Sequence, residues 1–385
     1  MRMIFADALD LARPALGKKL LQLNWPFLLL ITAITGIGVA ALYSVAGGSL
    51  DPWASRHVVR YCIGLGILFA LALIDIKWLM RLAYPTYLVA LLLLVAVLLW
   101  GVESGGARRW LGVGESSFQP SELMKVALVL ALARYYQWLP PDKVSRPQWL
   151  VIPLLMIAAP TLLALDQPDL GTAALFGIIG FGLLFLAGVS WFYFIAGAAG
   201  IVAALPHVWE RLHDYQRERI LTFIDPERDP LGSGYHILQS KIAIGSGGVA
   251  GKGFMQGTQA QLNFLPEKHT DFIFTMFAEE MGFLGAVLLL ALYLLALLFI
   301  AYMALRCRST FARLVAAGVG LALFAYVFIN VAMVTGLVPV VGLPLPLVSY
   351  GGTSMLTMMV ALGLVLNAHI NKSTQLRREE IRAFW

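Results

Sequence analysis

The sequence predicts an all-α polytopic membrane protein, a bundle of about ten transmembrane helices with one large extracytoplasmic loop between the seventh and the eighth. Three observations predict this fold. Hydrophobic residues make up 59% of the 385 residues and charged residues only 13%, whereas about a quarter of the residues in a soluble domain are charged. The mean hydropathy is +0.79. Apolar runs of about 20 residues, the length that crosses a bilayer, recur with polar residues between them.

Ten apolar runs follow one another, and we treat 1–385 as a single membrane domain. The shorter runs can cross the bilayer as members of a bundle, and the longest can tilt or kink. The predicted spans are 26–47, 58–75, 82–101, 118–137, 148–165, 171–188, 190–206, 270–302, 314–336 and 350–370.

The proline-rich segment 338–348 lies between the ninth and tenth runs. It cannot form a regular helix, because each proline lacks a backbone N–H donor. Irregular backbone at membrane depth is tolerated only against protein or a water-filled cavity. We therefore expect this segment to dip into the membrane in such surroundings.

The distribution of basic residues predicts the orientation. With the N-terminus in the cytoplasm, more than half of the 28 basic residues fall on inner segments, as the positive-inside rule requires. Both termini are then cytoplasmic, and the loop 207–269 is outside. The net charge of +6 does not indicate nucleic acid, because the basic residues flank the inner ends of the spans, where the membrane lipid supplies anionic headgroups.

The loop 207–269 is too long and polar for a simple connector. Apolar residues in its second half predict short amphipathic pieces on the membrane surface. Its glycine-rich stretch 245–253 differs from a phosphate-binding loop at Ser246 and Gly253, and no strand precedes it to support a dinucleotide site. We interpret the stretch as a flexible turn on which a neighbouring helix or lipid headgroup packs closely.

Ionisable residues at the ends of apolar runs are the candidates for function, because an unpaired charge in hydrocarbon is costly. Glu122 and Lys125 share a helix face at i, i+3 just after Pro120. They form either a functional pair or a local salt bridge at a helix start. Asp169, which precedes another predicted helix, is interpreted first as a helix cap.

Asp271 stands at the membrane boundary where the large loop enters the eighth span, with Lys268 and His269 beside it. His269 and Asp271 at i, i+2 do not share a helix face, which argues against a metal pair. Ser349 lies in a corner, 344–352, whose small and hydroxyl residues we expect to face a cavity.

Several of these segments resemble the signatures of SEDS proteins, the bacterial cell-wall polymerases of elongation, division and sporulation. The segments are 264–274 with 278–282, 119–122 and 344–352. Within that family, 225–236 and 257–259 look more like the RodA (rod-shape, elongation) branch than the FtsW (division) branch. The resemblance covers nearly the whole chain.

The resemblance implies a peptidoglycan glycosyltransferase that joins the disaccharide units of lipid II into a glycan chain at the outer face of the bacterial cytoplasmic (inner) membrane. Such chemistry needs a base beside the attacking hydroxyl and positive charge beside the diphosphate leaving group. We assign catalytic roles to Asp271, as the base, and to Glu122, which would orient a basic group or a cation. The expected substrate-binding residues are Lys125, Arg109, Lys268, His269 and Ser349. A divalent cation, Mg²⁺ or Mn²⁺, is an alternative partner for the diphosphate, and no metal ligand is assigned.

An α-linked donor that yields a β-linked glycan implies inversion by a single displacement. The alternative function is a lipid II flippase or a related transporter. The ionisable clusters gather at the outer boundary and not through the midplane, which favours the enzyme. The resemblance also implies two partners, a class B penicillin-binding protein with transpeptidase activity and the elongation machinery.

Overall fold

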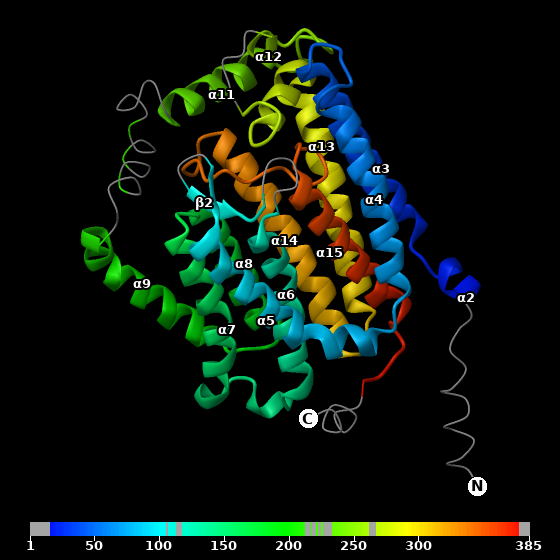
Figure 1. Cartoon of the computed structure of the whole chain (residues 1–385), viewed down its shortest axis with the longest axis vertical. Coiled ribbons are helices and arrows are strands. Elements are labelled where there is room, and N and C mark those ends of the chain that lie inside the picture. Colours follow the sequence, from blue (N-terminus) through cyan, green and yellow to red (C-terminus); the bar gives the residue numbers. More distant parts are fainter. Residues whose placement is uncertain are drawn as a thin grey trace.

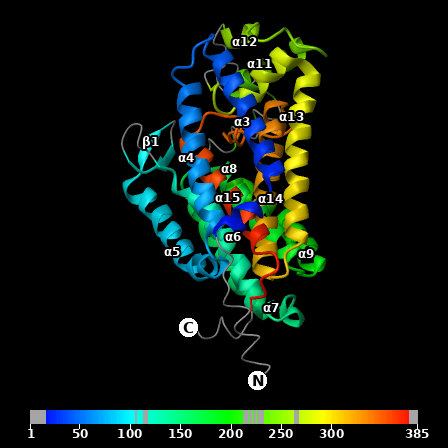
Figure 2. The same ribbon diagram turned by 90° about the vertical axis from the view of Figure 1, so that its right-hand side faces the viewer.

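The computed structural model describes residues 16–376 apart from 105–106, 113–117, 262–266 and, except for 217, 221 and 225, 212–232. It is a bundle of long helices with a small cap of shorter elements at one end (Figures 1 and 2). The first half contains α2 (Leu16–Leu21), α3 (Trp25–Val45), α4 (Ala54–Leu73), α5 (Ile76–Trp100), β1 (Val102–Ser104), β2 (Ala107–Trp110), α6 (Pro120–Trp138), the 3-10 helix η2 (Pro141–Lys143) and α7 (Pro147–Asp166). The second half contains α8 (Leu170–Leu186), α9 (Trp191–Arg211), α11 (Ser233–Gly247), α12 (Thr258–Gln261), α13 (Ile273–Leu305), α14 (Thr310–Val334) and α15 (Gly352–Ile370).

Each of the ten predicted apolar runs falls on a helix. Seven of the described helices, α3, α4, α5, α7, α13, α14 and α15, are long and apolar enough to cross a membrane. The apolar parts of α8 and α9 are shorter, and α6 carries Glu122, Lys125 and Arg134. The all-α membrane fold is thus confirmed, whereas the number of ten crossings stays a prediction.

Helix α6 is the buried centre of the bundle. All of its residues except Leu123 and Trp138 are buried, because α5, α7, α8, α14 and α15 pack around it. A helix enclosed by protein needs no lipid-facing apolar surface, so it can carry charged residues if neighbouring groups pair with them. This position explains why α6 is the least hydrophobic of the ten helices.

Helix α13 is broken near its N-terminal end at Gly282, where the backbone leaves the helical conformation (φ 65°, ψ −166°). The glycine-rich turn after α11 fits into this break. The Phe283 N–H donates to the Gly248 carbonyl at 2.9 Å. A Cβ atom on Gly251, whose φ is +81°, would lie 2.1 Å from the Glu280 carbonyl oxygen. The predicted close packing of a neighbouring element on this stretch is confirmed, and that element is a helix. Residues 245–247 belong to α11 itself, and the predicted flexibility stays a prediction.

Two buried carboxylates on α13 hold the segment that follows this turn. Glu279 accepts hydrogen bonds from the Lys252 ammonium at 2.6 Å and from the Thr258 N–H at 3.0 Å. Glu280 accepts one from the Ser44 hydroxyl of α3 at 2.5 Å. The cap of the molecule is thus tied to α13 and α3 by satisfied buried charges, as burial of a carboxylate requires.

The segment between α14 and α15 is irregular, as its prolines predict. Leu343, Leu345, Leu347 and Val348 are buried at 3% exposure or less, so this backbone lies against protein. A Cβ atom on Gly38 of α3 would lie 2.6 Å from the Val348 Cα, which shows how closely α3 approaches. The part of the prediction that places irregular backbone against protein is confirmed.

Some element boundaries differ from the predicted ones. Helix α5 begins at Ile76, six residues before the predicted span, because Asp75 caps it by accepting from the Lys77 N–H at 2.9 Å. Helix α9 continues to Arg211, into the predicted loop 207–269. The sequence analysis also missed the antiparallel pair β1–β2. Some of the apolar residues that predicted amphipathic pieces lie on α11 and none lies on α12. The placement of α11 on a membrane surface stays a prediction.

Candidate active site

Asp271 lies in the short turn that precedes α13, and two neighbouring elements fix that turn. The Asn330 side chain on α14 donates to the Asp271 carbonyl at 2.9 Å and to the Leu343 carbonyl at 2.7 Å. Phe272 and Ile273, which follow, are buried at 3% and 0% exposure. The backbone at Asp271 is therefore fixed to α14 and to the irregular segment, which leaves the carboxylate as the free part of the residue.

Ser349 completes this attachment. Its hydroxyl donates to the Thr270 carbonyl at 2.6 Å and accepts from the Leu345 N–H at 2.7 Å. The Tyr350 N–H donates to the His269 carbonyl at 2.9 Å. Ser349 is only 4% exposed, so in this structure its hydroxyl positions the turn of Asp271. Contact between Ser349 and a substrate stays a prediction.

The Asp271 carboxylate is half-buried, and among the described residues it accepts no hydrogen bond. Burial raises its pKa to about 7, the Glu267 carboxylate adds to the rise, and Arg109 opposes it. A carboxyl group whose pKa lies near neutral pH can both accept and release a proton there. This is the property expected of a general base.

Arg109 comes from β2, and the turn between α7 and α8 positions its side chain. Its guanidinium donates to the Pro168 carbonyl at 2.5 Å, and its Nε lies 3.8 Å from an Asp169 oxygen. Asp169 also caps α8 by accepting from the Thr172 N–H at 3.2 Å and the Thr172 hydroxyl at 2.8 Å. The cap interpretation of Asp169 is confirmed, and the same carboxylate holds Arg109 within electrostatic range of Asp271.

Lys268 and His269 lie beside Asp271 in the same turn. The His269 ring stacks on Trp53, with centroids 4.5 Å apart and planes at 10°. Burial lowers the pKa of both Lys268 and His269. Among the described residues, His269 Nδ1 is buried without a hydrogen-bond partner, so it is available to a bound molecule.

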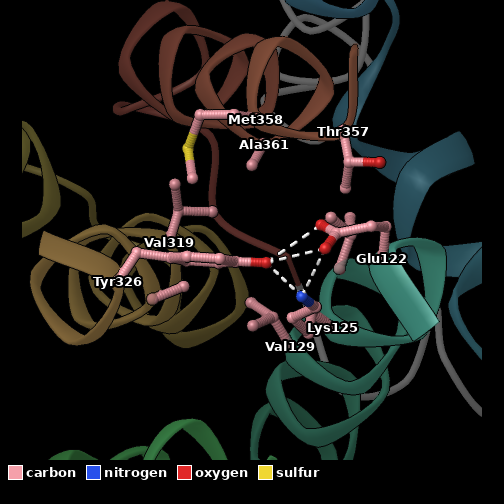
Figure 3. Close-up of a pocket in the computed structure, with 10 residues that line it drawn as sticks. Glu122, Lys125, Val129, Val319, Tyr326, Thr357, Met358 and Ala361 are labelled. Atoms are coloured by element: carbon pink, nitrogen blue, oxygen red, sulfur yellow. Dashed lines mark hydrogen bonds and ion pairs between the residues drawn. The ribbon is translucent and has the colours of Figure 1, made fainter. Parts of the chain in front are cut away.

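Glu122 and Lys125 form a separate buried group with Tyr326 of α14 (Figure 3). The Lys125 ammonium donates to Glu122 at 2.7 Å and to the Tyr326 hydroxyl. The Tyr326 hydroxyl in turn donates to the two Glu122 oxygens at 3.0 and 2.9 Å. Glu122 and Lys125 are 5% and 4% exposed. The pair of Glu122 and Lys125 that both sequence interpretations require is present. The structure adds a third member, Tyr326, which comes from another helix.

A small cavity adjoins this group, enclosed by apolar side chains of α6, α14 and α15 such as Val129, Val319 and Ala361 (Figure 3). It offers about 20 Å³ to the centres of water molecules, which is room for about one water. Asp169 lies within electrostatic range of Tyr326. Asp169, which also pairs with Arg109, therefore lies near enough to this group to interact with it electrostatically.

The predicted site residues thus form two groups: Asp271, Arg109, Lys268, His269 and Ser349 surround the start of α13, whereas Glu122 and Lys125 lie inside the bundle. Sequence reasoning missed Arg60, whose guanidinium lies 4.6 Å from the centre of the Tyr350 ring. The sequence signal that could have identified Arg60 was its position as a charged residue within the predicted span 58–75. Nothing in the apolar run of α14 distinguishes Tyr326 as a partner of Glu122.

No three His, Cys, Asp or Glu side chains gather as metal ligands in the part of the chain that the structure describes. A divalent cation stays a prediction from the sequence, and no step of the reaction is assigned to it.

A sequence model of the FtsW, RodA and SpoVE family, whose members are described as cell cycle proteins, matches residues 22–374. The peptidoglycan glycosyltransferase MrdB of Escherichia coli K12 is 44% identical over 354 residues, which cover 91% of this chain and 94% of MrdB. The probable peptidoglycan glycosyltransferase FtsW of Thiomicrospira cyclica is 38% identical over 360 residues, covering 89% and 91%.

Solved structures share the fold over almost the same length. One is a chain from work on the structural coordination of polymerization and crosslinking by a peptidoglycan synthase complex, with a TM-score of 0.81, 36% identity, and coverage of 92% of this chain and 99% of that one. The other is the crystal structure of Thermus thermophilus rod shape determining protein RodA, with a TM-score of 0.69, 32% identity, and coverage of 92% and 98%.

Proposed function

This chain belongs to the FtsW, RodA and SpoVE family, the SEDS proteins, and is a peptidoglycan glycosyltransferase; we propose that Asp271 is the general base of its reaction. The family model spans most of the chain, and the relatives that carry the enzyme's name are covered almost completely. These relatives do not favour the alternative function, a lipid II flippase. We further propose lipid II as the donor, because the predicted reaction at the membrane surface needs a lipid-linked disaccharide.

The observation that carries the proposal is the state of the Asp271 carboxylate. Burial raises its pKa to about 7, and its own backbone is fixed by Asn330. A base with this pKa is ionised in about half of the molecules at neutral pH and takes a proton readily from an attacking hydroxyl. Asp271 would remove the proton of the acceptor sugar hydroxyl as that oxygen attacks the anomeric carbon of the donor.

Arg109, Lys268 and His269 serve the other half of the reaction. The bond that breaks leaves a diphosphate, which is already ionised and needs no proton from an acid. A guanidinium and an ammonium close to the base would stabilise the charge of this leaving group. Arg109 is held by Asp169 and the Pro168 carbonyl, so it is oriented before substrate binds. A single displacement of this kind inverts the anomeric configuration.

In this proposal Glu122 and Lys125 do not touch the reacting atoms and act on them indirectly. Their buried ion pair closes on Tyr326, and Asp169 lies within electrostatic range of that tyrosine. The group would thereby set the electrostatic environment of Asp169 and, through it, the position of Arg109. Glu122 orients a basic group, Lys125, which agrees with the role expected for it from the sequence.

The chain is a multi-pass membrane protein, and we place it in the bacterial cytoplasmic membrane with both termini in the cytoplasm. The similarity to a chain of a peptidoglycan synthase complex supports a penicillin-binding protein as its partner. The proposed partner is a class B transpeptidase that crosslinks the glycan which this chain polymerises. The similarity to the rod shape determining protein RodA of Thermus thermophilus supports a role in elongation.

The direct test uses the purified chain in detergent with lipid II as the only substrate. Detergent micelles have no second compartment, so transport cannot produce a signal. We expect glycan chains of increasing length on a gel, and a mock purification from cells that do not express the chain serves as the control for contaminating polymerases. A folded preparation that binds lipid II without lengthening any glycan would overturn the assignment.

A further inference from the structure

The C-terminal ends of α13 and α15 and the N-terminal end of α14 lie at the end of the bundle opposite α11 and α12 (Figures 1 and 2). Four basic residues belong to these helix ends. Arg306 is the C-terminal cap of α13, and Arg308 precedes Ser309, the N-terminal cap of α14. Arg313 lies in the first turn of α14, and Lys372 follows α15. None of them takes part in the reaction proposed above.

Backbone and electrostatic contacts bring these three helix ends together. The Arg308 N–H donates to the Lys372 carbonyl at 2.9 Å. Lys372 and Arg313 both lie within electrostatic range of the Cys307 thiol. Lys372 and Arg306 both lie within range of the His369 ring. The basic groups therefore surround a common region and are not scattered over the surface.

This basic cluster, Arg306, Arg308, Arg313 and Lys372, has no acidic partner in the described ranges, where the ion pairs involve other residues. Arg306 instead stacks on the Tyr302 ring, 4.8 Å from its centroid. Like charges held close together repel one another, and an anion bound between them offsets this repulsion by attracting both. His369 Nδ1, at the same place, is a buried nitrogen without a hydrogen-bond partner.

Helix dipoles explain only part of the cluster. Arg306 and Lys372 follow the C-terminal ends of α13 and α15, where a positive charge is favoured. Arg308 and Arg313 flank the N-terminal end of α14, where the dipole disfavours a positive charge. Two of the four cations thus stand at the unfavourable end of a helix, where a bound anion would offset the dipole.

Apolar groups border the cluster on the side of α13. Leu305 is 81% exposed and Tyr302 is 47% exposed. An exposed leucine beside arginines and a tyrosine is the composition of the membrane–water boundary, where acyl chains meet headgroups. A phosphate bound here therefore has hydrocarbon beside it.

We propose that the basic cluster at the adjoining ends of α13, α14 and α15 binds the phosphate of an anionic phospholipid, with the lipid chains lying along Leu305. Basic pockets between transmembrane helices are known as sites for anionic headgroups. Arg306 and Lys372 face the phosphate from two helix ends, and Arg313 faces it from the third.

The test is native mass spectrometry of the full chain in detergent with added phosphatidylglycerol or phosphatidylcholine. We expect retention of phosphatidylglycerol over phosphatidylcholine. The triple substitution Arg306→Gln, Arg313→Gln, Lys372→Gln should weaken phosphatidylglycerol binding on the order of 100-fold, at about fivefold for each cation removed. Arg146→Gln is the matched control, because Arg146 is also exposed at a helix end and has no described ion pair; binding should not change.

Two further measurements keep the test decisive. Glycan polymerisation by the triple variant shows that it is folded, and Arg313→Lys, which keeps the charge, should retain the lipid. Equal binding of both lipids, or undiminished phosphatidylglycerol binding by a folded triple variant, would overturn the proposal. Inorganic phosphate that binds the cluster as tightly as phosphatidylglycerol would show a site for a free anion and would overturn the assignment to a lipid.

Discussion

Asp271→Asn keeps the size and shape of the side chain and removes the charge that accepts a proton. If Asp271 is the general base, the rate of glycan polymerisation should fall about 100- to 10,000-fold, the usual contribution of a positioned base. Binding of the donor lipid should persist, because Arg109 and Lys268 are unchanged. The Asn330 bond to the backbone carbonyl of residue 271 does not involve the substituted group, so the turn before α13 should keep its structure.

The raised pKa of Asp271 gives the same substitution a second, opposite effect on stability. The pKa rises from 3.8 to about 7. Between these two pH values the folded state keeps a proton that the unfolded state has released, so the free energy of unfolding falls as the pH rises through this window. The difference of about three pKa units corresponds to at most about 4 kcal/mol above pH 7. Partial exposure of the carboxylate to water reduces this value.

The assay follows polymerisation of lipid II and thermal unfolding of the same preparations from pH 5 to pH 9. Wild-type activity should rise with pH through an inflection near 7, as the base becomes ionised, and the Asn variant should lose this inflection. The variant should unfold at a higher temperature than wild type at pH 8, and this difference should be smaller at pH 5, where the pH has crossed only part of the window. Asp166→Asn is the control, because Asp166 is exposed at the end of α7.

An Asn variant that polymerises lipid II at nearly the wild-type rate would refute the mechanism. Asp271 would then have a structural role, and another carboxylate, with Glu122 as the next candidate, would be the base. A large loss of activity without any change in the pH profile of stability would instead show that the Asp271 carboxylate is not desolvated in the folded protein.

Three further predictions concern the buried ion pair, the turn in α13 and the topology. Glu122→Gln should depress polymerisation strongly while the amount of membrane-inserted protein stays near normal; loss of folded protein on quantitative blots would indicate a purely structural salt bridge. Gly251→Ala should lower thermal stability by about 1–3 kcal/mol, because its Cβ would meet a backbone oxygen at 2.1 Å, whereas Gly245→Ala, with open space around it, should not; equal melting temperatures would contradict this packing. A reporter active only outside the cytoplasm should be silent after Trp385 and active within 207–269, and the opposite labelling would reverse the proposed orientation.

The apolar runs determined where the helices form, because a chain in lipid must pair every backbone N–H and C=O internally and a helix does so within one segment. The cost of placing charge in hydrocarbon likewise identified Asp271 and the pair of Glu122 and Lys125. An ionisable group in or beside an apolar run is costly unless it is paired or faces a cavity. The prolines of 338–348 likewise excluded a helix. Each of these inferences needs only neighbouring residues, so the sequence alone was sufficient.

The partners of those groups were decided by tertiary structure. Tyr326 meets Glu122 across 204 positions of sequence, and Asn330 reaches the backbone of Asp271 across 59. A transmembrane helix is apolar both where it faces lipid and where it faces protein, so hydropathy does not show which side carries a contact. The break at Gly282 also depends on a distant turn that supplies its carbonyl groups. Only the packing of the helices against one another selects these pairs.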